Sequence, residues 1–268
     1  MDFTLLLLYF PMGALVGFIA GLLGVGGGAI LVPAFLVAAH AEHFPAEHAM
    51  HMALGTSLAC ILASSFSSAR THLKKGAVNI DVVKGMAPAI FVGSLAGTFL
   101  AARLPAAPLK WLFLSFLIYV AQDLLRKPKP VAKSSLPGIQ GLMLVGGLIG
   151  GFSSLVGIGG ASLSVAFLVW CSVGMHEAIG TSAALGVAIS LAGTMGYIFN
   201  GWGIEHLPPG SLGFVYLPAF LGVTLTSYFV APYGARAAHR LPVQTLRRVF
   251  ALFLLTVSLR MAAAQLGW

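Results

Sequence analysis

Two apolar blocks of this chain are too long for one membrane span. They cover residues 5–39 and 139–173, each of 35 residues, whereas one helix needs about 20 residues to cross a bilayer. Each block is interrupted by glycines, "GVGGGAILVP" at 24–33 and "GIGGASLSVA" at 157–166. Because glycine permits tight chain reversals, each long block is predicted to be a broken or re-entrant helical hairpin.

Composition places the whole chain in a bilayer. Hydrophobic residues make up 58% of 268 and charged residues only 8%, far below the roughly one-quarter charged share of soluble domains. Six further apolar blocks complete the pattern: 50–69, 82–102, 109–125, 177–199, 211–230 and 247–264. We therefore expect an all-α, multi-pass integral membrane protein, with the lipid bilayer as its surroundings.

The net charge of +8 does not indicate nucleic-acid binding. The basic residues fall in short loops between apolar blocks, where they set membrane topology. If each long block is a hairpin, twelve of the 15 lysines and arginines lie on one face, and three lie on the other: Arg103, Lys110 and Arg260. The loops 40–48 and 200–210 contain no Lys or Arg and are expected outside the cell.

An internal duplication is the next feature of the sequence. The segment 17–37 aligns with 150–170, and "HMALGTS" at 51–57 aligns with "HEAIGTS" at 176–182. Two later matches follow in the same order in both halves. Four matches in one order predict a duplicated unit.

The joint between the halves defines the domain organisation. A polar, proline-rich linker at 126–138 separates a first membrane repeat, 1–125, from a second, 139–268. Each repeat has five segments, a helical hairpin followed by three transmembrane helices. Because five is odd, the second repeat is expected to sit inverted relative to the first, with the linker in the cytoplasm. Inverted repeats with discontinuous helices are typical of secondary transporters.

The glycine motifs predict a binding site at the hairpin tips. The residues after each tip start a new helix, "AILVPAFLV" or "ASLSVAFLV", whose free N–H groups point toward the tip. A helix N-terminus carries partial positive charge and attracts anions. Two such ends entering from opposite faces would bracket one central position. The alternative is that the glycines only allow close helix packing.

Two "GTS" sequences add hydroxyl groups to this region. Thr56-Ser57 and Thr181-Ser182 are expected near the starts of the helices that follow the glycine motifs. Hydroxyls can donate to an oxyanion without adding a fixed countercharge. Ordinary interhelical hydrogen bonding is the alternative.

Histidines and acids limit the chemistry. His51 and His176 stand at matching positions before the two "GTS" sequences. Either can carry a coupling proton, although a histidine near a membrane surface needs no special role. No carboxylate falls clearly inside an apolar block, which disfavours cation transport. The histidines of loop 40–48 fit a hydrated loop better than a metal site, and no metal or cofactor is expected.

The paired glycine motifs resemble the TauE/SafE family of sulfite or organosulfonate exporters. The resemblance rests on "LLGVGGG" and "LVGIGG" with "LGTS" and "IGTS", and it covers nearly the whole chain. It implies a secondary carrier in the inner (plasma) membrane that exports small sulfur-containing oxyanions. The anion site that it implies lies around these residues: Gly26, Gly27, Gly28, Thr56, Ser57, Gly159, Gly160, Thr181 and Ser182. Ala161 stands where the first motif has Gly28, so it joins the candidates, but the two tips need not be equivalent.

Several alternatives remain open at this point. A carrier for another substrate, such as a thiolated organic acid or a metal ion, would keep the same architecture. A membrane-embedded enzyme is disfavoured, because no nucleophile, base and orienting group occur together, and no catalytic residue is expected. The sequence leaves open the exact substrate, the coupling ion and whether the protein forms a homo-oligomer.

Overall fold

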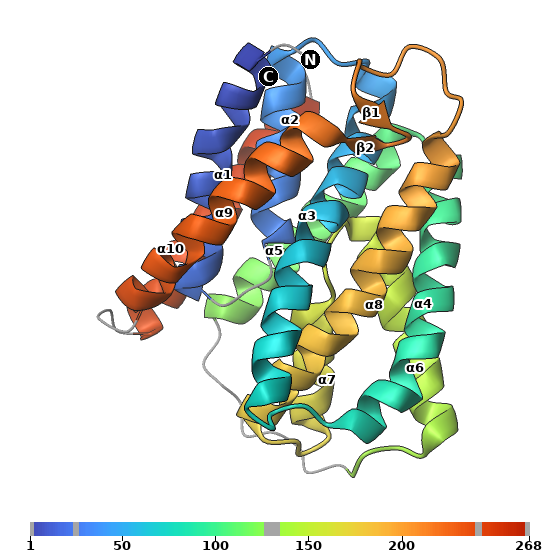
Figure 1. Ribbon diagram of the computed structural model, residues 1–268, viewed down its shortest axis with the longest axis vertical. Helices are drawn as coiled ribbons and strands as arrows, with labels where there is room; N and C mark the ends of the chain where they lie inside the picture. The colour runs from blue at the N-terminus through green and yellow to red at the C-terminus, as the bar shows by residue number, and fades with distance from the viewer. Residues whose placement is uncertain (1–2, 24–26, 126–134, 239–242, 266–268) are drawn as a thin grey trace.

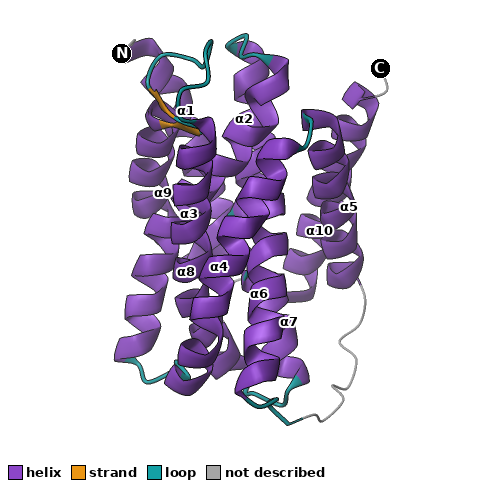
Figure 2. Ribbon diagram, turned by 90° about the vertical axis from the view of Figure 1, so that its right-hand side faces the viewer, coloured by secondary structure: helices purple, strands orange, loops and turns teal. Residues whose placement is uncertain are grey.

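The computed structural model describes residues 3–23, 27–125, 135–238 and 243–265, which form a helical bundle (Figure 1, Figure 2). The first half contains α1 (Phe3–Leu23), α2 (Gly28–Ala41), α3 (Ala46–Lys74), α4 (Ile80–Arg103) and α5 (Ala106–Leu125). The second half contains α6 (Ile139–Val156), α7 (Ala161–Trp170), α8 (Met175–Gly201), α9 (Leu217–Ala238) and α10 (Val243–Gln265). A short antiparallel ribbon, β1 (Ser211–Leu212) and β2 (Val215–Tyr216), precedes α9.

Five of the described helices are long and apolar enough to cross a membrane. They are α3, α4, α5, α6 and α8. Shorter apolar stretches occur within or make up α1, α2, α7 and α9. In a bilayer every backbone polar group needs an internal partner, and helices satisfy this requirement. The predicted class, an all-α multi-pass membrane protein, is confirmed.

Both long apolar blocks are broken where the glycines fall. The first divides into α1 and α2, and the second into α6 and α7. Gly157 ends α6 with φ +68°, and Gly160 adopts φ +67° directly before α7, a left-handed region that glycine enters without the steric cost other residues incur. In Figure 1, α2 returns toward the end where the N-terminus lies, whereas α7 runs toward the opposite end. The two expected breaks are therefore present, and their hairpins enter from opposite ends.

Helix contacts follow a pattern that stays the same when the two halves are exchanged. Helix α1 packs along α9 and α4 packs along α6, so the first helix of each half contacts the fourth helix of the other. Helices α3 and α8 pack together and run in opposite directions (Figure 1), and α5 packs on α10. An inverted duplication requires this pattern, and the duplication itself stays a prediction.

Facing glycines hold α4 and α6 close together. A Cβ added to Gly93 would meet the backbone of Gly147, and one added to Gly97 would meet the backbone of Gly151. Small residues four positions apart let two helices approach closely inside a membrane. The contact between these two helices therefore depends on the absence of side chains.

Gly97→Ala is expected to destabilise the α4–α6 contact. Its methyl group would collide with the carbonyl oxygen of Gly151, a backbone atom that cannot turn aside. Overpacking of this kind costs about 1–3 kcal/mol of unfolding free energy, which chemical denaturation in detergent micelles measures. Gly147→Ala is the matched control, since its Cβ would lie 3.7 Å from the nearest atom, Ala89 O. Equal losses in the two variants would contradict this packing argument.

One expected apolar block differs from the structure at its start. The sequence predicts 211–230 as one apolar segment, but its first six residues form the ribbon, and α9 begins at Leu217. Gly210 and Gly213 have φ values of +88° and +55°, which helical backbone does not adopt. Apolar composition alone cannot separate a short buried strand from a helix.

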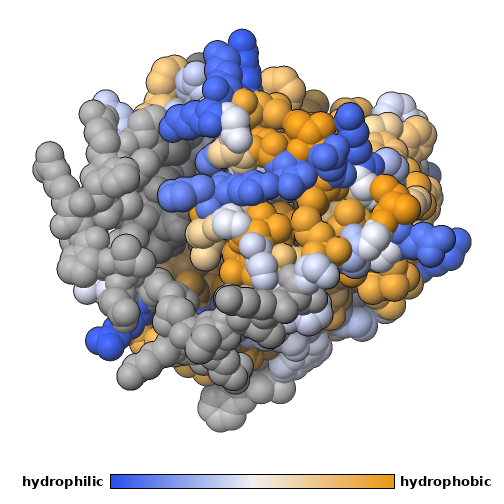
Figure 3. All heavy atoms as spheres, turned by 90° about the horizontal axis from the view of Figure 1, so that it is seen from below, coloured by the Kyte–Doolittle hydropathy of each residue, from blue (hydrophilic) through white to orange (hydrophobic). Residues whose placement is uncertain are grey.

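The two ends of the molecule differ in charge. Exposed Arg70, Lys74, Lys75 and Lys84 lie where α3 ends and α4 begins. Figure 3 views this end and shows hydrophilic side chains spread over apolar ones. We name it the basic end. The opposite end carries β1 and β2 (Figure 2) and is named the ribbon end.

Candidate functional site

The two helix breaks contact each other inside the bundle. A Cβ added to Gly28, the first residue of α2, would lie 2.8 Å from Gly157 O and 3.0 Å from Ile158 Cα. These residues are all buried, as are Gly27 and Gly160. Helix α2 leaves this junction toward the ribbon end and α7 leaves it toward the basic end (Figure 1). The break before α2 therefore contacts the break between α6 and α7, and the two helices leave this junction in opposite directions.

Neither of these N-termini is capped by a side chain. Gly27 precedes α2 and Gly160 precedes α7, and neither position has a side-chain hydrogen bond to the helix. The first N–H groups of a helix have no partner within it. They carry the positive end of the helix dipole, equivalent to roughly half an elementary charge. Two such ends together can bind an anion without a lysine or arginine.

Three serines with buried hydroxyls flank the second break. Ser153, Ser154 and Ser164 are at most 1% exposed, and their Oγ atoms have no hydrogen-bond partner among the described residues. Ser153 Oγ lies 3.1 Å from the position that a Cβ on Gly160 would take. A buried hydroxyl left unpaired costs about 1–3 kcal/mol. A ligand that accepts hydrogen bonds from these serines would recover that energy.

The serines of the two "GTS" sequences are bonded to the second break. Ser57 Oγ donates to Gly157 O at 3.1 Å, and Ser182 Oγ donates to Ala161 O at 3.2 Å. Both side chains are buried. In this conformation both hydroxyls donate their hydrogen bonds to backbone carbonyls. These bonds connect α3 and α8 to the second break.

The threonines of these sequences each accept a backbone N–H from the other half. Tyr216 N donates to Thr56 Oγ1 at 2.9 Å, and Asn79 N donates to Thr181 Oγ1 at 2.8 Å. Tyr216 directly precedes α9 and Asn79 directly precedes α4, so the two contacts are equivalent when the halves are exchanged. A hydroxyl that accepts a hydrogen bond retains its own proton to donate.

The glycine of each "GTS" lets these segments come close. A Cβ on Gly55 would lie 2.8 Å from Phe214 O, and one on Gly180 would meet Ala77 O. Phe214 and Ala77 each stand three residues before the helix that follows them. In each half, the Gly and Thr of the motif therefore contact the segment that precedes a helix of the other half, and the two contacts have the same spacing.

Each threonine contact extends to a carboxylate near one end of the molecule. Tyr216 Oη donates to Glu42 Oε2 at 3.4 Å at the ribbon end. Asn79 Nδ2 donates to Glu177 Oε1 at 2.7 Å at the basic end. We name these groups the ribbon-end latch (Thr56, Tyr216 and Glu42) and the basic-end latch (Thr181, Asn79 and Glu177).

Removing either threonine hydroxyl is expected to destabilise the protein. In Thr56→Val and Thr181→Val the shape is kept, but a backbone N–H loses its acceptor, which costs about 1–3 kcal/mol. Thermal unfolding followed by tryptophan fluorescence measures the loss. Thr71→Val is the control, because this exposed hydroxyl bonds only to Ser67 O of its own helix. Stabilities within 0.5 kcal/mol of each other in all three variants, roughly the range of surface substitutions, would contradict the latches.

The structure brings most of the predicted site residues together. Gly27, Gly28, Gly159, Gly160 and Ala161 lie at the junction of the two breaks. The four "GTS" hydroxyls contact the second break or the latch segments. Gly26 lies outside the described residues.

One placement is wrong. Thr56 and Thr181 do not lie near the starts of their helices, since they follow the first residues of α3 and α8 by ten and six positions. The reason is that α3 already begins at Ala46, directly after Pro45. The hydroxyls therefore lie deeper in the bundle than the sequence predicts.

The two matched histidines do not share one environment. His51 is 5% exposed, and its Nε2 lies 3.1 Å from both Ala101 O and Leu104 O. A carbonyl oxygen can only accept a hydrogen bond, so Nε2 carries a proton. It donates to carbonyls at the C-terminal end of α4 and so caps that helix. His176 is exposed at the start of α8. Proton coupling at these positions stays a prediction.

Sequence reasoning missed the latch partners and the unpaired serines. A usable signal for the serines was present, because "FSSLVGIGGASLS" at 152–164 surrounds the second motif with hydroxyls, whereas the first motif has none. The latch partners carried no such signal, because Asn79 and Tyr216 meet their threonines across more than 100 positions of sequence.

This helical membrane bundle contains two broken helices whose breaks contact each other in its interior, which is the architecture of a secondary transporter. The comparisons agree with this class and specify it. The family model described as sulfite exporter TauE/SafE matches residues 9–261, so the chain belongs to that family. No solved structure matches it.

Three relatives carry the name "Probable membrane transporter protein". The protein from Haemophilus influenzae is 38% identical over 263 residues, which cover 97% of this chain and 98% of the relative. The protein YdhB of Bacillus subtilis is 27% identical over 70% of this chain and 77% of its own. A protein of Methanocaldococcus jannaschii is 26% identical over 92% of both chains. The chain is thus a multi-pass membrane transporter of a small substrate, and not an enzyme.

Proposed function

We propose that this transporter is a secondary carrier for a small sulfur-containing oxyanion, sulfite or an organosulfonate, held between the first turns of α2 and α7. One observation carries the proposal: the two helix breaks contact each other where Gly28 begins α2 and where Gly157 and Ile158 lead toward α7, so two uncapped helix N-termini start from one buried junction. An oxyanion offers several acceptor oxygens to the free amides. The description of the matching family, a sulfite exporter, supports this substrate class.

The unpaired serines fit the same ligand. Ser153 lies beside Gly160 with a buried hydroxyl that needs an acceptor. Hydrogen bonds to a charged acceptor contribute about 1.5–3 kcal/mol each. Helix amides and hydroxyls together hold an anion without a fixed positive charge, so the site can release it as readily as it binds it.

Transport by alternating access follows from an inverted duplication, with repeats 1–125 and 139–268 joined by a cytoplasmic linker at 126–138. Each end of the molecule has one latch, and the latches are equivalent under exchange of the halves. Opening the site toward one end requires that end's latch to break. The exposed lysines and arginines of the basic end support its position on the cytoplasmic side of the plasma membrane.

Export is the proposed direction. A cell interior is electrically negative, so an anion leaves it downhill. A potential of about 100 mV contributes about 2.3 kcal/mol per charge, or roughly fortyfold in concentration. Export therefore needs no coupling ion, and the protein acts as a uniporter.

Flux of labelled sulfite from proteoliposomes tests this function. Vesicles loaded with sulfite are given an inside-negative potassium diffusion potential and, separately, a pH gradient. We expect saturable efflux that the potential accelerates and that the pH gradient leaves unchanged. Acceleration by the pH gradient alone would replace uniport by proton coupling. If folded protein gave a flux no higher than empty liposomes, sulfite would be excluded as the substrate. Organosulfonates, thiosulfate and thiolated acids would then be tested.

A further inference from the structure

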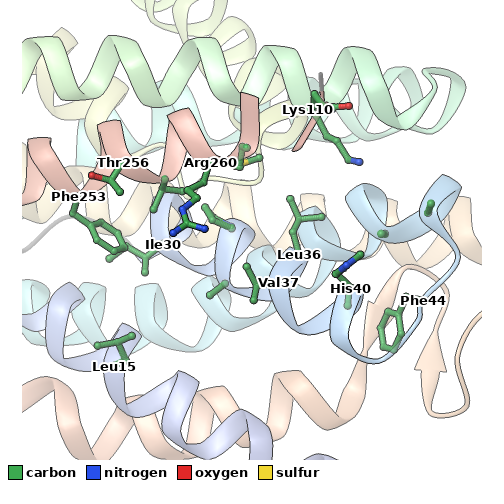
Figure 4. Close-up of a pocket in the computed structure, with 18 residues that line it drawn as sticks. Leu15, Ile30, Leu36, Val37, His40, Phe44, Lys110, Phe253, Thr256 and Arg260 are labelled. Atoms are coloured by element: carbon green, nitrogen blue, oxygen red, sulfur yellow. The ribbon is translucent and has the colours of Figure 1, made fainter. Parts of the chain in front are cut away.

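A cavity lies apart from the helix breaks, among α1, α2, α5 and α10. Its volume is about 650 Å³, within the range of roughly 300–1,000 Å³ typical of ligand sites. Its walls are mainly apolar, and the largest apolar side chains include Leu15, Ile30, Leu36 and Phe253 (Figure 4). The glycines of the two breaks do not line it, so it is not the site described above.

Two cations reach into this apolar cavity. Lys110 extends from α5 and Arg260 from α10, each toward α2 (Figure 4). No carboxylate lines the cavity, and within the described part of the chain no ion pair involves either side chain. They are two of the three cations that the charge pattern places away from the basic end. Lys110 is half-buried and Arg260 is exposed, so both can meet a ligand at the cavity mouth, and two cations without an acid beside an apolar wall favour an anionic one.

The cavity is about one lipid leaflet deep. Its deepest residues, Leu15, Ile30 and Phe253, lie 12, 11 and 12 positions from the ribbon-end termini of α1, α2 and α10. At 1.5 Å per residue these separations are roughly 16–18 Å, and half of the hydrocarbon core is about 15 Å. Lys110 and Arg260 lie four and five positions from their helix ends, or roughly 6–8 Å.

From this arrangement we infer that the cavity binds an anionic phospholipid of the ribbon-end leaflet, with its phosphate on Lys110 and Arg260 and one acyl chain among the apolar side chains below. The backbone positions of the two cations lie a few ångströms inside the hydrocarbon core, from which their long side chains can reach the phosphate, and the apolar walls lie at the depth of the acyl chain. The planar guanidinium of Arg260 suits phosphate, which it can contact with two parallel N–H groups.

A small hydrated oxyanion fits this cavity poorly. It would leave its water for walls that offer almost no hydrogen-bond donors below Arg260, and that desolvation would not be offset. The hydroxyl of Thr256, the polar side chain that lines this part, already donates to Leu252 O of its own helix. The lipid site is independent of the transported substrate, and its test does not require transport.

Native mass spectrometry of the full chain tests the lipid site. Purified protein is exchanged into detergent with equal amounts of phosphatidylglycerol and phosphatidylcholine of the same chain length. We expect preferential retention of phosphatidylglycerol by the wild type. Each cation near a membrane surface contributes roughly fivefold to binding an anionic lipid, so Lys110→Gln with Arg260→Gln lowers the preference about thirtyfold. Arg103→Gln, an exposed cation at the same end outside the cavity, leaves it within about twofold.

Two further measurements decide whether a lipid or a small oxyanion occupies the cavity. Ala34→Phe fills the cavity and is expected to lower phosphatidylglycerol retention at least tenfold, roughly the effect of 1.4 kcal/mol. Inorganic sulfate at the ionic strength of a chloride control is expected to displace no more lipid than chloride does. The lipid site would be overturned if the double variant kept its preference for phosphatidylglycerol, or if Arg103→Gln lowered that preference equally. It would also be overturned if Ala34→Phe retained as much lipid as the wild type, or if sulfate displaced lipid selectively.

Discussion

Gly28→Val is expected to reduce saturable sulfite flux about ten- to a hundredfold while the protein still inserts and folds as a bundle. The added side chain would start 2.8 Å from Gly157 O and 3.0 Å from Ile158 Cα. Both are backbone atoms, so the two helix breaks must move apart. Overpacking costs about 1–3 kcal/mol, and each 1.4 kcal/mol lost from the binding site is tenfold in rate.

The matched control is Gly138→Val. Gly138 precedes α6 with an ordinary φ of −60°, and nothing lies within 4 Å of a Cβ placed there. It should retain wild-type flux in the same vesicles. If both variants transport alike, close contact between the two breaks is not needed for transport, and the proposed site is in the wrong place.

Ser153→Ala separates a binding role from a structural one. Its hydroxyl is buried without a partner, so removing it relieves an unpaired polar group and should leave thermal stability unchanged or raised by about 1 kcal/mol. If the hydroxyl donates to the transported anion, the same change raises the KM for sulfite at least tenfold, since such a bond is worth about 1.5–3 kcal/mol.

A raised KM with unchanged or higher stability is expected only if Ser153 contacts the substrate. Ser115→Ala is the control, because this exposed hydroxyl donates to Trp111 O on its own helix and should change neither quantity. An unchanged KM in Ser153→Ala would remove this serine from the site. A joint fall in stability and flux would give it a purely structural role.

Much of the fold was predictable because a bilayer restricts the choices. Block lengths and the positions of glycines predicted two broken helices, and α1–α2 and α6–α7 confirm them. The ribbon at Ser211–Tyr216 was missed, because these residues were predicted as part of one apolar block. The sequence "PPGSLG" at 208–213 contains turn residues, and Gly210 and Gly213 adopt positive φ values in the structure.

The candidate site was predictable where a motif repeats and not where the contact is long-range. The glycines and the two "GTS" sequences stand out because each occurs twice. The role expected for Ser57 changed in the structure, because its hydroxyl already donates a hydrogen bond to Gly157 O in the second break. Asn79 and Tyr216 become partners only once α4 and α9 pack on the opposite half.

Anomalous diffraction from crystals grown with selenite tests the central claim most directly, since selenite has the charge and shape of sulfite and selenium can be located by its scattering. The account predicts one strong peak between the first turns of α2 and α7, within hydrogen-bond distance of their free amides and of Ser153 Oγ. A peak bound elsewhere in the bundle, with none at the junction of Gly28 and Gly157, would contradict it.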